Sequence, residues 1–332
     1  MAQAIEQQLL VRQRRRPGGE LPRPDHTRVM VVANQKGGVG KTTTAVNMAA
    51  ALAQGGLRVL VIDLDPQGNA STALSVDHHR GTLSSYDVLV EGMALADVVQ
   101  PHPDLANLFV VPATIDLAGA EIELVSVVAR ENRLRRAITA HRLITDAGTD
   151  QIATDQIAAD QFDTDQFDYV LIDCPPSLGL LTLNALVAGA EMLIPIQAEY
   201  YALEGLGQLL ETVEMVRTHL NRGLTVSTIL ITMYDSRTNL AAGVAAEVRE
   251  HFPEQVLKTA IPRSVRVSEA PSYGQSVMTY DPASPGALSY LEAARELAHR
   301  GVGPGVGPGT DMGDAPESGA GTSIGSDLGV SR

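Results

Sequence analysis

The chain of 332 residues contains no tryptophan, a single cysteine and few aromatic residues. Cys174 by itself cannot form an internal disulfide, and one cysteine is too few for a cysteine-built metal site. No apolar run approaches the roughly 18–20 residues that a membrane-spanning helix needs. Near the start, a cluster of arginines follows a short apolar stretch, whereas a secretory signal has its basic residues first. We therefore expect a cytosolic protein.

Lysine is also scarce, with three lysines against 22 arginines, and two of the three (Lys36 and Lys41) lie five residues apart. The formal net charge of −14 argues against a surface that attracts nucleic acid everywhere. The charge is uneven, because residues 1–27 carry +2, residues 146–167 carry −6 and residues 301–332 carry −3, which leaves −7 for the remainder. Any surface that binds nucleic acid must therefore be a local patch.

Composition divides the chain into three parts. Residues 1–27 are polar, contain arginine and proline and show no periodicity, which predicts a disordered arm. Residues 301–332 are rich in Gly, Pro and Ser, which predicts a disordered tail. The folded domain is expected to span residues 28–300.

One segment inside that domain is repetitive. Residues 149–168, TDQIATDQIAADQFDTDQFD, are four copies of a five-residue unit. Four such short copies cannot build a solenoid, which needs repeated supersecondary units. Two interpretations stay open for the insertion at about 146–167: a flexible acidic loop lengthened by duplication, or an element that binds a partner.

Elsewhere in the domain, short apolar runs alternate with helical patterns. The runs are β-branched and nearly continuous, which is typical of strands buried on both faces. Helices are expected at 42–54 and 203–220. The alternation predicts an α/β fold with a doubly wound, mostly parallel sheet flanked by helices, in which ligands bind at the carboxyl ends of the strands. The expected strands are 28–34, 58–65, 108–113, 168–175, 191–197 and 227–234.

A glycine-rich turn lies between the first expected strand and the first helix, which is the context of a phosphate-binding P-loop. Glycines let backbone N–H groups turn toward phosphate oxygens, and the helix N-terminus adds partial positive charge. Lys41 is expected to reach the β- and γ-phosphates, and the Thr42 hydroxyl to ligate Mg²⁺. A glycine turn with a threonine cap would need no ligand, but the strand before it and the helix after it favour ATP. The nucleotide-binding residues expected here are Lys36, Gly37, Gly38, Val39, Gly40, Lys41, Thr42 and Thr43.

The strict P-loop pattern, G-x-x-x-x-G-K-[ST], fails in this chain, because Gln35 stands at its first glycine and Lys36 follows. The sequence KGGVGKT resembles the deviant Walker A loop of the family that includes ParA, MinD and nitrogenase iron protein. In that family the early lysine reaches across a dimer interface to the partner's nucleotide. The resemblance implies that Lys36 binds the phosphates held by a second subunit and takes part in catalysis there.

Two expected strands end in carboxylates. VLIDC places Asp173 at the end of its apolar run, as a Walker B strand does, and this carboxylate is expected to hold Mg²⁺ opposite Thr42. VIDLD supplies Asp63 and Asp65. The resemblance assigns the positioning of the attacking water to Asp65, whereas Asp63 would support Mg²⁺ or Lys41. Catalysis would consist of positioning and electrostatic stabilisation, and we expect hydrolysis to be slow.

The resemblance to chromosomal ParA (Soj-type) partition ATPases extends over roughly residues 28–300. Segments such as PATIDLAGAEIEL, IPIQAEYYALEGLGQLLETV and IPRSVRVSEAPSYGQ occur in the family's order. One departure is Ser264, where the family often has Asn. The family implies an ATP-dependent homodimer that binds double-stranded DNA without sequence preference, a centromere-binding ParB-like partner that stimulates hydrolysis, and a location on the nucleoid.

The same resemblance points to further site residues. Arg237 and Arg266 match the family's DNA-contacting positions, and arginine–phosphate contacts give salt-sensitive binding that ignores sequence. Without interleaved aromatic residues, the chain is not suited to single-strand recognition. The adenine is expected near Pro262 and Ser264. Further candidates are Arg217, Arg222 and Lys258 for DNA and Arg263 for adenine.

Two alternatives to a DNA-segregation ATPase remain open at this stage. A positioning ATPase of the same family could act on a membrane surface or a protein scaffold instead of DNA. A MinD-like protein would need an amphipathic C-terminal helix, which residues 301–332 cannot form, so no membrane partner is expected. An iron-protein-like reductase would need more cysteines than Cys174, which we expect in the core. An amide-forming ligase on the same loop is the second alternative.

Overall fold

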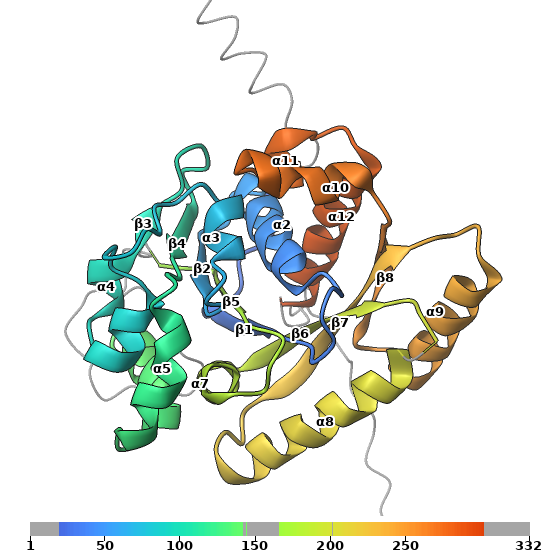
Figure 1. The fold of residues 1–332 in the computed structure, drawn as a ribbon. Helices are drawn as coiled ribbons and strands as arrows, with labels where there is room; N and C mark the ends of the chain where they lie inside the picture. Colours follow the sequence, from blue (N-terminus) through green and yellow to red (C-terminus); the bar gives the residue numbers. More distant parts are fainter. Residues whose placement is uncertain (1–19, 142–143, 145–165, 201, 302–332) are drawn as a thin grey trace, which may run out of the picture. The chain divides into compact units, whose positions relative to one another are not determined.

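The computed structural model describes residues 20–141, 144, 166–200 and 202–301. Across these residues the chain forms an eight-stranded sheet in the order β3-β4-β2-β5-β1-β6-β7-β8 (Figure 1). Every neighbouring pair is parallel except β3 with β4, which is antiparallel. The strands are β1 Arg28–Val32, β2 Val59–Asp63, β3 Gln100–Pro101, β4 Leu108–Val111, β5 Tyr169–Asp173, β6 Glu191–Gln197, β7 Thr225–Tyr234 and β8 Val256–Pro262.

Helices cover both faces of this sheet (Figure 1). One face packs against α2 (Lys41–Gln54), α3 (Asn69–Ala73), α10 (Val265–Glu269), η4 (Ala270–Tyr273), α11 (Val277–Tyr280) and α12 (Pro285–Arg300). The other face packs against η1 (Asp87–Glu91), α4 (Leu95–Val98), α5 (Leu117–Glu123), η2 (Leu124–Ser126), α6 (Arg133–Thr139), α7 (Leu180–Ala188), α8 (Ala202–His219) and α9 (Asn239–His251). The short η3 (Arg130–Asn132) buries no residue of its own and lies against α7.

The two apolar clusters explain why the strands have near-continuous apolar sequences. In β1, Met30 and Val32 face one helical layer while Val29 and Val31 face the other, and all four are buried. A strand covered on both faces has no exposed side and therefore no polar alternation. The prediction of a doubly wound, mostly parallel α/β sheet is confirmed, and each expected strand and helix is present within a few residues.

The ends of the domain differ from the expectation in detail. The disordered arm was expected to reach residue 27, but Leu21 is buried and its N–H donates to the Gly55 carbonyl at 2.9 Å. The Thr27 hydroxyl donates to the Phe167 carbonyl at 2.7 Å. Residues 20–27 therefore belong to the packed part of the chain, because Leu21 covers the end of α2. Residues 1–19, most of the insertion and residues 302–332 lie outside the described residues.

In the described ranges, no helix combines the length and the apolar character needed to cross a membrane.

Candidate nucleotide-binding site

Three adjacent strands bring the predicted loop and carboxylates together. β5 lies between β2 and β1, with Asp63 in register with Asp173 and Val32 in register with Asp173. Because these strands are parallel, their carboxyl ends lie at one edge of the sheet, where ligands of such folds bind. The loop from Ala33 to Gly40 leaves β1 at this edge and leads into α2. The predicted convergence of the loop with both strand ends is therefore present.

The loop backbone depends on two of its glycines. Gly38 has φ 75° and Gly40 has φ 86°. Residues with a Cβ adopt this left-handed backbone conformation only with strain. Gly40 is the N-cap of α2, so helical N–H groups begin directly after it. Gly37 and Gly38 have no heavy atom within 4 Å of where a Cβ would lie, which leaves space in front of the backbone. This arrangement suits an anion at the helix N-terminus.

Neighbouring strands hold the loop in place. The Asn34 amide donates to the Pro195 carbonyl at 2.8 Å and accepts from the Lys36 N–H at 3.0 Å. The buried Thr232 hydroxyl donates to the Val39 carbonyl at 2.8 Å. Sequence reasoning did not single out Asn34 or Thr232. The signal for Asn34 is its place at the end of β1, but nothing in the sequence pairs Thr232 with a loop 193 residues away.

Lys41 lies inside the loop. Its ammonium donates to the Lys36 carbonyl at 3.2 Å, and the residue is 7% exposed. Burial lowers the pKa of Lys41, while the nearby Asp173 carboxylate favours the charged form. Among the described residues the ammonium bonds to this one carbonyl, so it is well placed to bind phosphate oxygens. Thr42 and Thr43 follow it on the first turn of α2, both half-buried.

Asp173 is the residue whose surroundings best indicate a cation site. The residue is 0% exposed, and among the described residues neither carboxylate oxygen has a hydrogen-bond partner. Burial raises the pKa of Asp173 well above its usual range, and the Asp63 charge raises it further. The Thr42 hydroxyl opposes this shift without reaching the geometry of a full hydrogen bond. Buried carboxylates are normally paired or coordinate a metal.

This donor set fits Mg²⁺. The described residues contain no cluster of three or more His, Cys, Asp or Glu side chains arranged to enclose a metal ion. Mg²⁺ does not need one, because it usually keeps several waters and takes one or two protein ligands plus phosphate oxygens. Asp173 and Thr42 are the residues that would hold it here, which stays a prediction.

Asp63 and Asp65 differ in what they contact. Asp63 is fully buried and accepts from the Ser71 N–H at 2.9 Å, from the Ser71 hydroxyl at 2.7 Å and from the Asp65 N–H at 3.0 Å. Burial raises the pKa of Asp63 to about 6, with these hydrogen bonds opposing the rise. Asp63 thus anchors the turn after β2, and its expected support of Mg²⁺ or Lys41 stays a prediction. Asp65 is 8% exposed. Within the described residues, its carboxylate accepts one hydrogen bond, from the Gln67 N–H at 3.0 Å.

Lys36 lies outside the loop interior that Lys41 occupies. Its side chain is 40% exposed, and its ammonium is 2.8 Å from a carboxylate oxygen of Glu199, just after β6. Glu199 also accepts a hydrogen bond from the Gln197 side chain. The two lysines of the loop therefore point to different surroundings, one toward the loop interior and one toward the molecular surface. No local pattern predicts the pairing of Glu199 with Lys36, because it depends on β6 lying beside β1.

The expected adenine and DNA residues lie at the ends of β7 and β8. Pro262 is in register with Tyr234, two residues beyond Thr232, and Ser264 is the N-cap of α10. Arg237 forms two bonds with Asp235, at 2.9 and 2.8 Å, and its side chain is 86% exposed. Arg266 is 3.1 Å from Glu269 and 3.4 Å from Asp281. Both arginines are exposed at the edge of the sheet that carries the loop.

A P-loop after β1, an orphaned carboxylate at the end of β5 and a lysine inside the loop together define a P-loop ATPase. Residues 27–226 match the family described as AAA domain. The chain is 48% identical over 274 residues to the sporulation initiation inhibitor protein Soj of Bacillus subtilis (strain 168), a match that covers 82% of this chain and 99% of that protein. It is 45% identical over 273 residues to the chromosome partitioning protein ParA of Caulobacter vibrioides (strain NA1000 / CB15N), covering 82% and 94%. The chain belongs to the ParA/Soj family of chromosome-partitioning ATPases.

Solved structures share the fold. Cobyrinic acid a,c-diamide synthase from Mycobacterium smegmatis, with bound ADP and magnesium, has a TM-score of 0.64 and 36% identity, covering 82% of this chain and 95% of that chain. The cell division ATPase MinD of Pyrococcus furiosus has a TM-score of 0.62 and 25% identity, covering 82% and 99%.

Proposed function

We propose that this protein is a cytoplasmic DNA-segregation ATPase that works as an ATP-dependent dimer bound to the nucleoid. ATP joins two subunits, the dimer binds double-stranded DNA without sequence preference, and a ParB-like centromere-binding protein stimulates slow hydrolysis that releases it. The observation that carries this proposal is the separation of the two loop lysines. Lys41 occupies the loop interior, whereas Lys36 is at the surface, where a second subunit's nucleotide could reach it.

The roles within one subunit follow from the contacts. Lys41 and the N–H groups from Gly37 to Thr43 bind phosphate oxygens, and Thr42 with Asp173 would hold Mg²⁺. When bound, Mg²⁺ neutralises charge on the phosphates. Asp65 would orient the attacking water, because its carboxylate lies at the edge of the site and, within the described residues, accepts only the Gln67 N–H. Pro262 and Ser264 would lie beside the adenine.

DNA binding is proposed for the surface that carries Arg237 and Arg266. In a protein of net charge −14, two exposed arginines per subunit give weak attraction, and a dimer doubles the phosphate contacts. In the free protein, Arg237 is paired with Asp235, and its hydrogen bonds hold the pKa of Asp235 at about 2. A phosphate must therefore compete with Asp235 for Arg237.

Because Asp235 and a DNA phosphate compete for Arg237, substitutions of the two residues should change DNA binding in opposite directions. Binding to an unrelated duplex is measured with ATP and with ADP over a range of salt concentrations. Arg237→Ala should weaken the ATP-dependent binding and lower its salt slope, whereas Asp235→Asn should strengthen it, because the turn bond to the Arg237 N–H can remain while the charge is removed. Arg295→Ala, which breaks a pair with Glu292 on α12, is the matched control and should leave binding unchanged. Equal binding with ATP and ADP would refute the proposal.

The same family allows a positioning ATPase that acts on a membrane surface or a protein scaffold. Co-sedimentation with anionic liposomes in the presence of ATP, beside the DNA assay, separates these functions. An amide-forming reaction is a further candidate, since the 36% identical structure is a cobyrinic acid a,c-diamide synthase. Product analysis with ATP, an ammonia source and cobyrinic acid decides that point.

A further inference from the structure

A cavity lies at the amino ends of the strands, opposite the edge of the sheet that carries the nucleotide site. It has a volume of about 700 Å³ and lies among η1, α4, α6 and the start of β2. Arg58, which lines it, precedes β2, whereas Asp63 ends that strand. Five residues of strand separate the two edges by roughly 16 Å. The cavity therefore does not belong to the nucleotide site, and nothing in the proposed function uses it.

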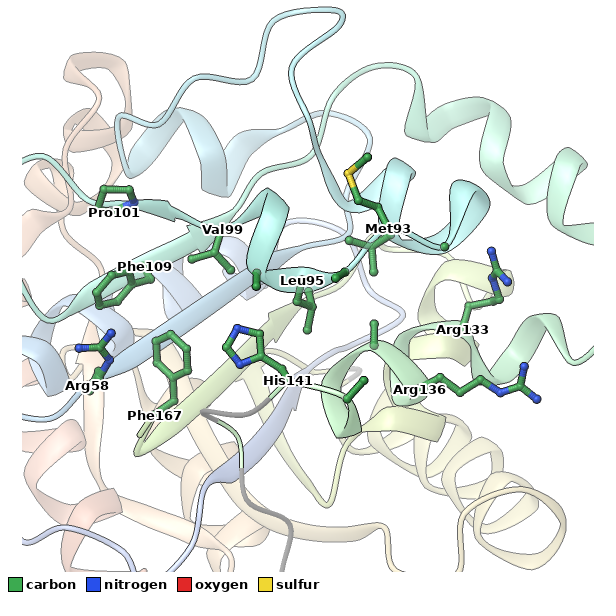
Figure 2. Close-up of a pocket in the computed structure, with 16 residues that line it drawn as sticks. Arg58, Met93, Leu95, Val99, Pro101, Phe109, Arg133, Arg136, His141 and Phe167 are labelled. Carbon is green, nitrogen blue, oxygen red and sulfur yellow. The ribbon is translucent and has the colours of Figure 1, made fainter. Parts of the chain in front are cut away.

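The lining combines apolar side chains with positive charge. Leu95, Val99 and Phe109 contribute apolar surface, while Arg133 and Arg136 lie at one end and Arg58 at the other (Figure 2). Among the described residues that line the cavity, none is Asp or Glu. In a chain of net charge −14, such a lining selects an occupant that is both acidic and apolar.

One wall of the cavity is formed by Phe167, a residue of the acidic repeat itself. Phe167 belongs to the last copy of the repeat, TDQFD, and is 1% exposed. Its ring meets Phe109 edge-on at 5.4 Å, and the Arg58 guanidinium lies 4.4 Å from the Phe109 ring centre and 5.2 Å from that of Phe167. The next residue, Asp168, accepts the Arg58 N–H at 2.6 Å. The Phe-Asp pair of the last repeat thus packs against the Phe109 ring and the Arg58 guanidinium, and its aspartate accepts the Arg58 N–H.

The copy before it carries the same pair. Residues 159–163 read ADQFD, so Phe162-Asp163 repeats Phe167-Asp168 five positions earlier. We propose that the cavity is the docking site for this acidic insertion of the same chain, with Phe162 as the apolar anchor and the neighbouring aspartates facing Arg133 and Arg136. The occupant is the segment of residues 145–165, which lies outside the described structure.

Chain connection and charge both favour this occupant. The segment leaves the described structure near His141 and Ile144 and re-enters at Gln166, and both His141 and Phe167 line the cavity. Phe162 is five residues from Phe167, a reach of at most about 17 Å. The segment carries six aspartates and no basic residue. A tether this short gives a local concentration of about millimolar, so even weak docking is populated.

The absence of tryptophan from the chain supplies the experiment. Phe162→Trp places a single indole on the proposed anchor of the full-length protein. We expect a blue-shifted emission and protection from acrylamide quenching, compared with the same protein unfolded in denaturant. Adding Arg136→Glu should shift the emission to the red and increase quenching, and so should high salt, because the attraction at this exposed rim is electrostatic.

The neighbouring Arg135 provides a matched control. It lies on the same helix and is exposed, but it does not line the cavity, so Arg135→Glu should leave the emission unchanged. Ala96→Glu is a second blocking variant, since it adds a carboxylate at an exposed position of the lining and should act as Arg136→Glu does. Emission typical of indole in water, equal effects of Arg135→Glu and Arg136→Glu, or a blue shift that grows with protein concentration would each overturn docking within one chain. Thermal unfolding of every variant verifies that the fold is kept.

Discussion

The ammonium of Lys36 is 2.8 Å from the carboxylate of Glu199, and both side chains are close to half exposed. This pair joins the loop after β1 to the end of β6. In a single subunit, Lys36 is therefore bound to a carboxylate of its own chain and not to the phosphate site that Lys41 lines. If Lys36 serves a second subunit, this pair must open when the dimer forms.

Lys36→Ala is expected to retain ATP binding and lose ATP-dependent dimerisation, because Lys41 and the backbone still bind phosphate while the cation between subunits is gone. Nucleotide affinity by calorimetry and mass by size exclusion with light scattering measure the two effects. A normal ATP-dependent dimer of the variant would remove the proposed role of Lys36.

Glu199→Gln should act in the opposite direction, because it releases Lys36 from a competing carboxylate. An exposed ion pair contributes about 0–1 kcal/mol, so the ATP concentration at half-dimerisation should fall by no more than about fivefold. The measurement is dimer mass against ATP concentration at fixed protein. Glu214→Gln, which breaks the exposed pair with Arg217 on α8, is the control; an unchanged midpoint for Glu199→Gln would show that the pair does not restrain the lysine.

For Asp173→Asn we expect two effects of opposite sign. The nucleotide-free protein should be more stable by about 1 kcal/mol or more, because a buried carboxylate without partners is replaced by a neutral amide. The further stabilisation by Mg²⁺ with ATP should be lost. Thermal unfolding with and without Mg-ATP reads out both, and a variant that is less stable without ligand would contradict the account of Asp173 as an orphaned charge.

Asp65→Ala should bind ATP and dimerise but hydrolyse ATP slowly, since the group proposed to orient the water is absent. The dimers are expected to remain on DNA in the presence of ATP. Phosphate release and dissociation from immobilised duplex measure this, and turnover at the rate of the unmodified protein would exclude Asp65 from that role.

The raised pKa of Asp63 gives a pH dependence of stability. The folded protein holds a proton on Asp63 up to about pH 6, whereas the unfolded chain releases it near pH 4. Between these values the folded state binds more protons, so the free energy of unfolding falls as the pH rises, by about 3 kcal/mol for this group. Denaturant unfolding of the ligand-free protein and of Asp63→Asn at pH 4 to 7 tests this, and a difference between them that does not vary with pH would contradict it.

Much of the fold follows from local patterns. Strands β1, β2, β4, β5, β6 and β7 were predicted, because burial on both faces makes their sequences nearly continuous in apolar residues. The two-residue strand β3 was not predicted. β8 and the final helices were not predicted as elements; Lys258 and Thr259 interrupt the apolar run of β8. The start of the packed chain at Leu21 was also missed, since one apolar residue in a polar stretch gives no periodic signal.

What the sequence alone determined is the set of local elements and the loop chemistry, because glycines at Gly38 and Gly40, a lysine and a threonine at fixed spacing impose their own backbone and helix start. The tertiary structure decided which distant groups meet: Thr232 on the Val39 carbonyl, Ser71 on Asp63, Glu199 on Lys36, and no partner in the described structure on Asp173. These contacts join residues of different strands, helices and loops. Their pairing depends on strand order and register, which no local pattern encodes.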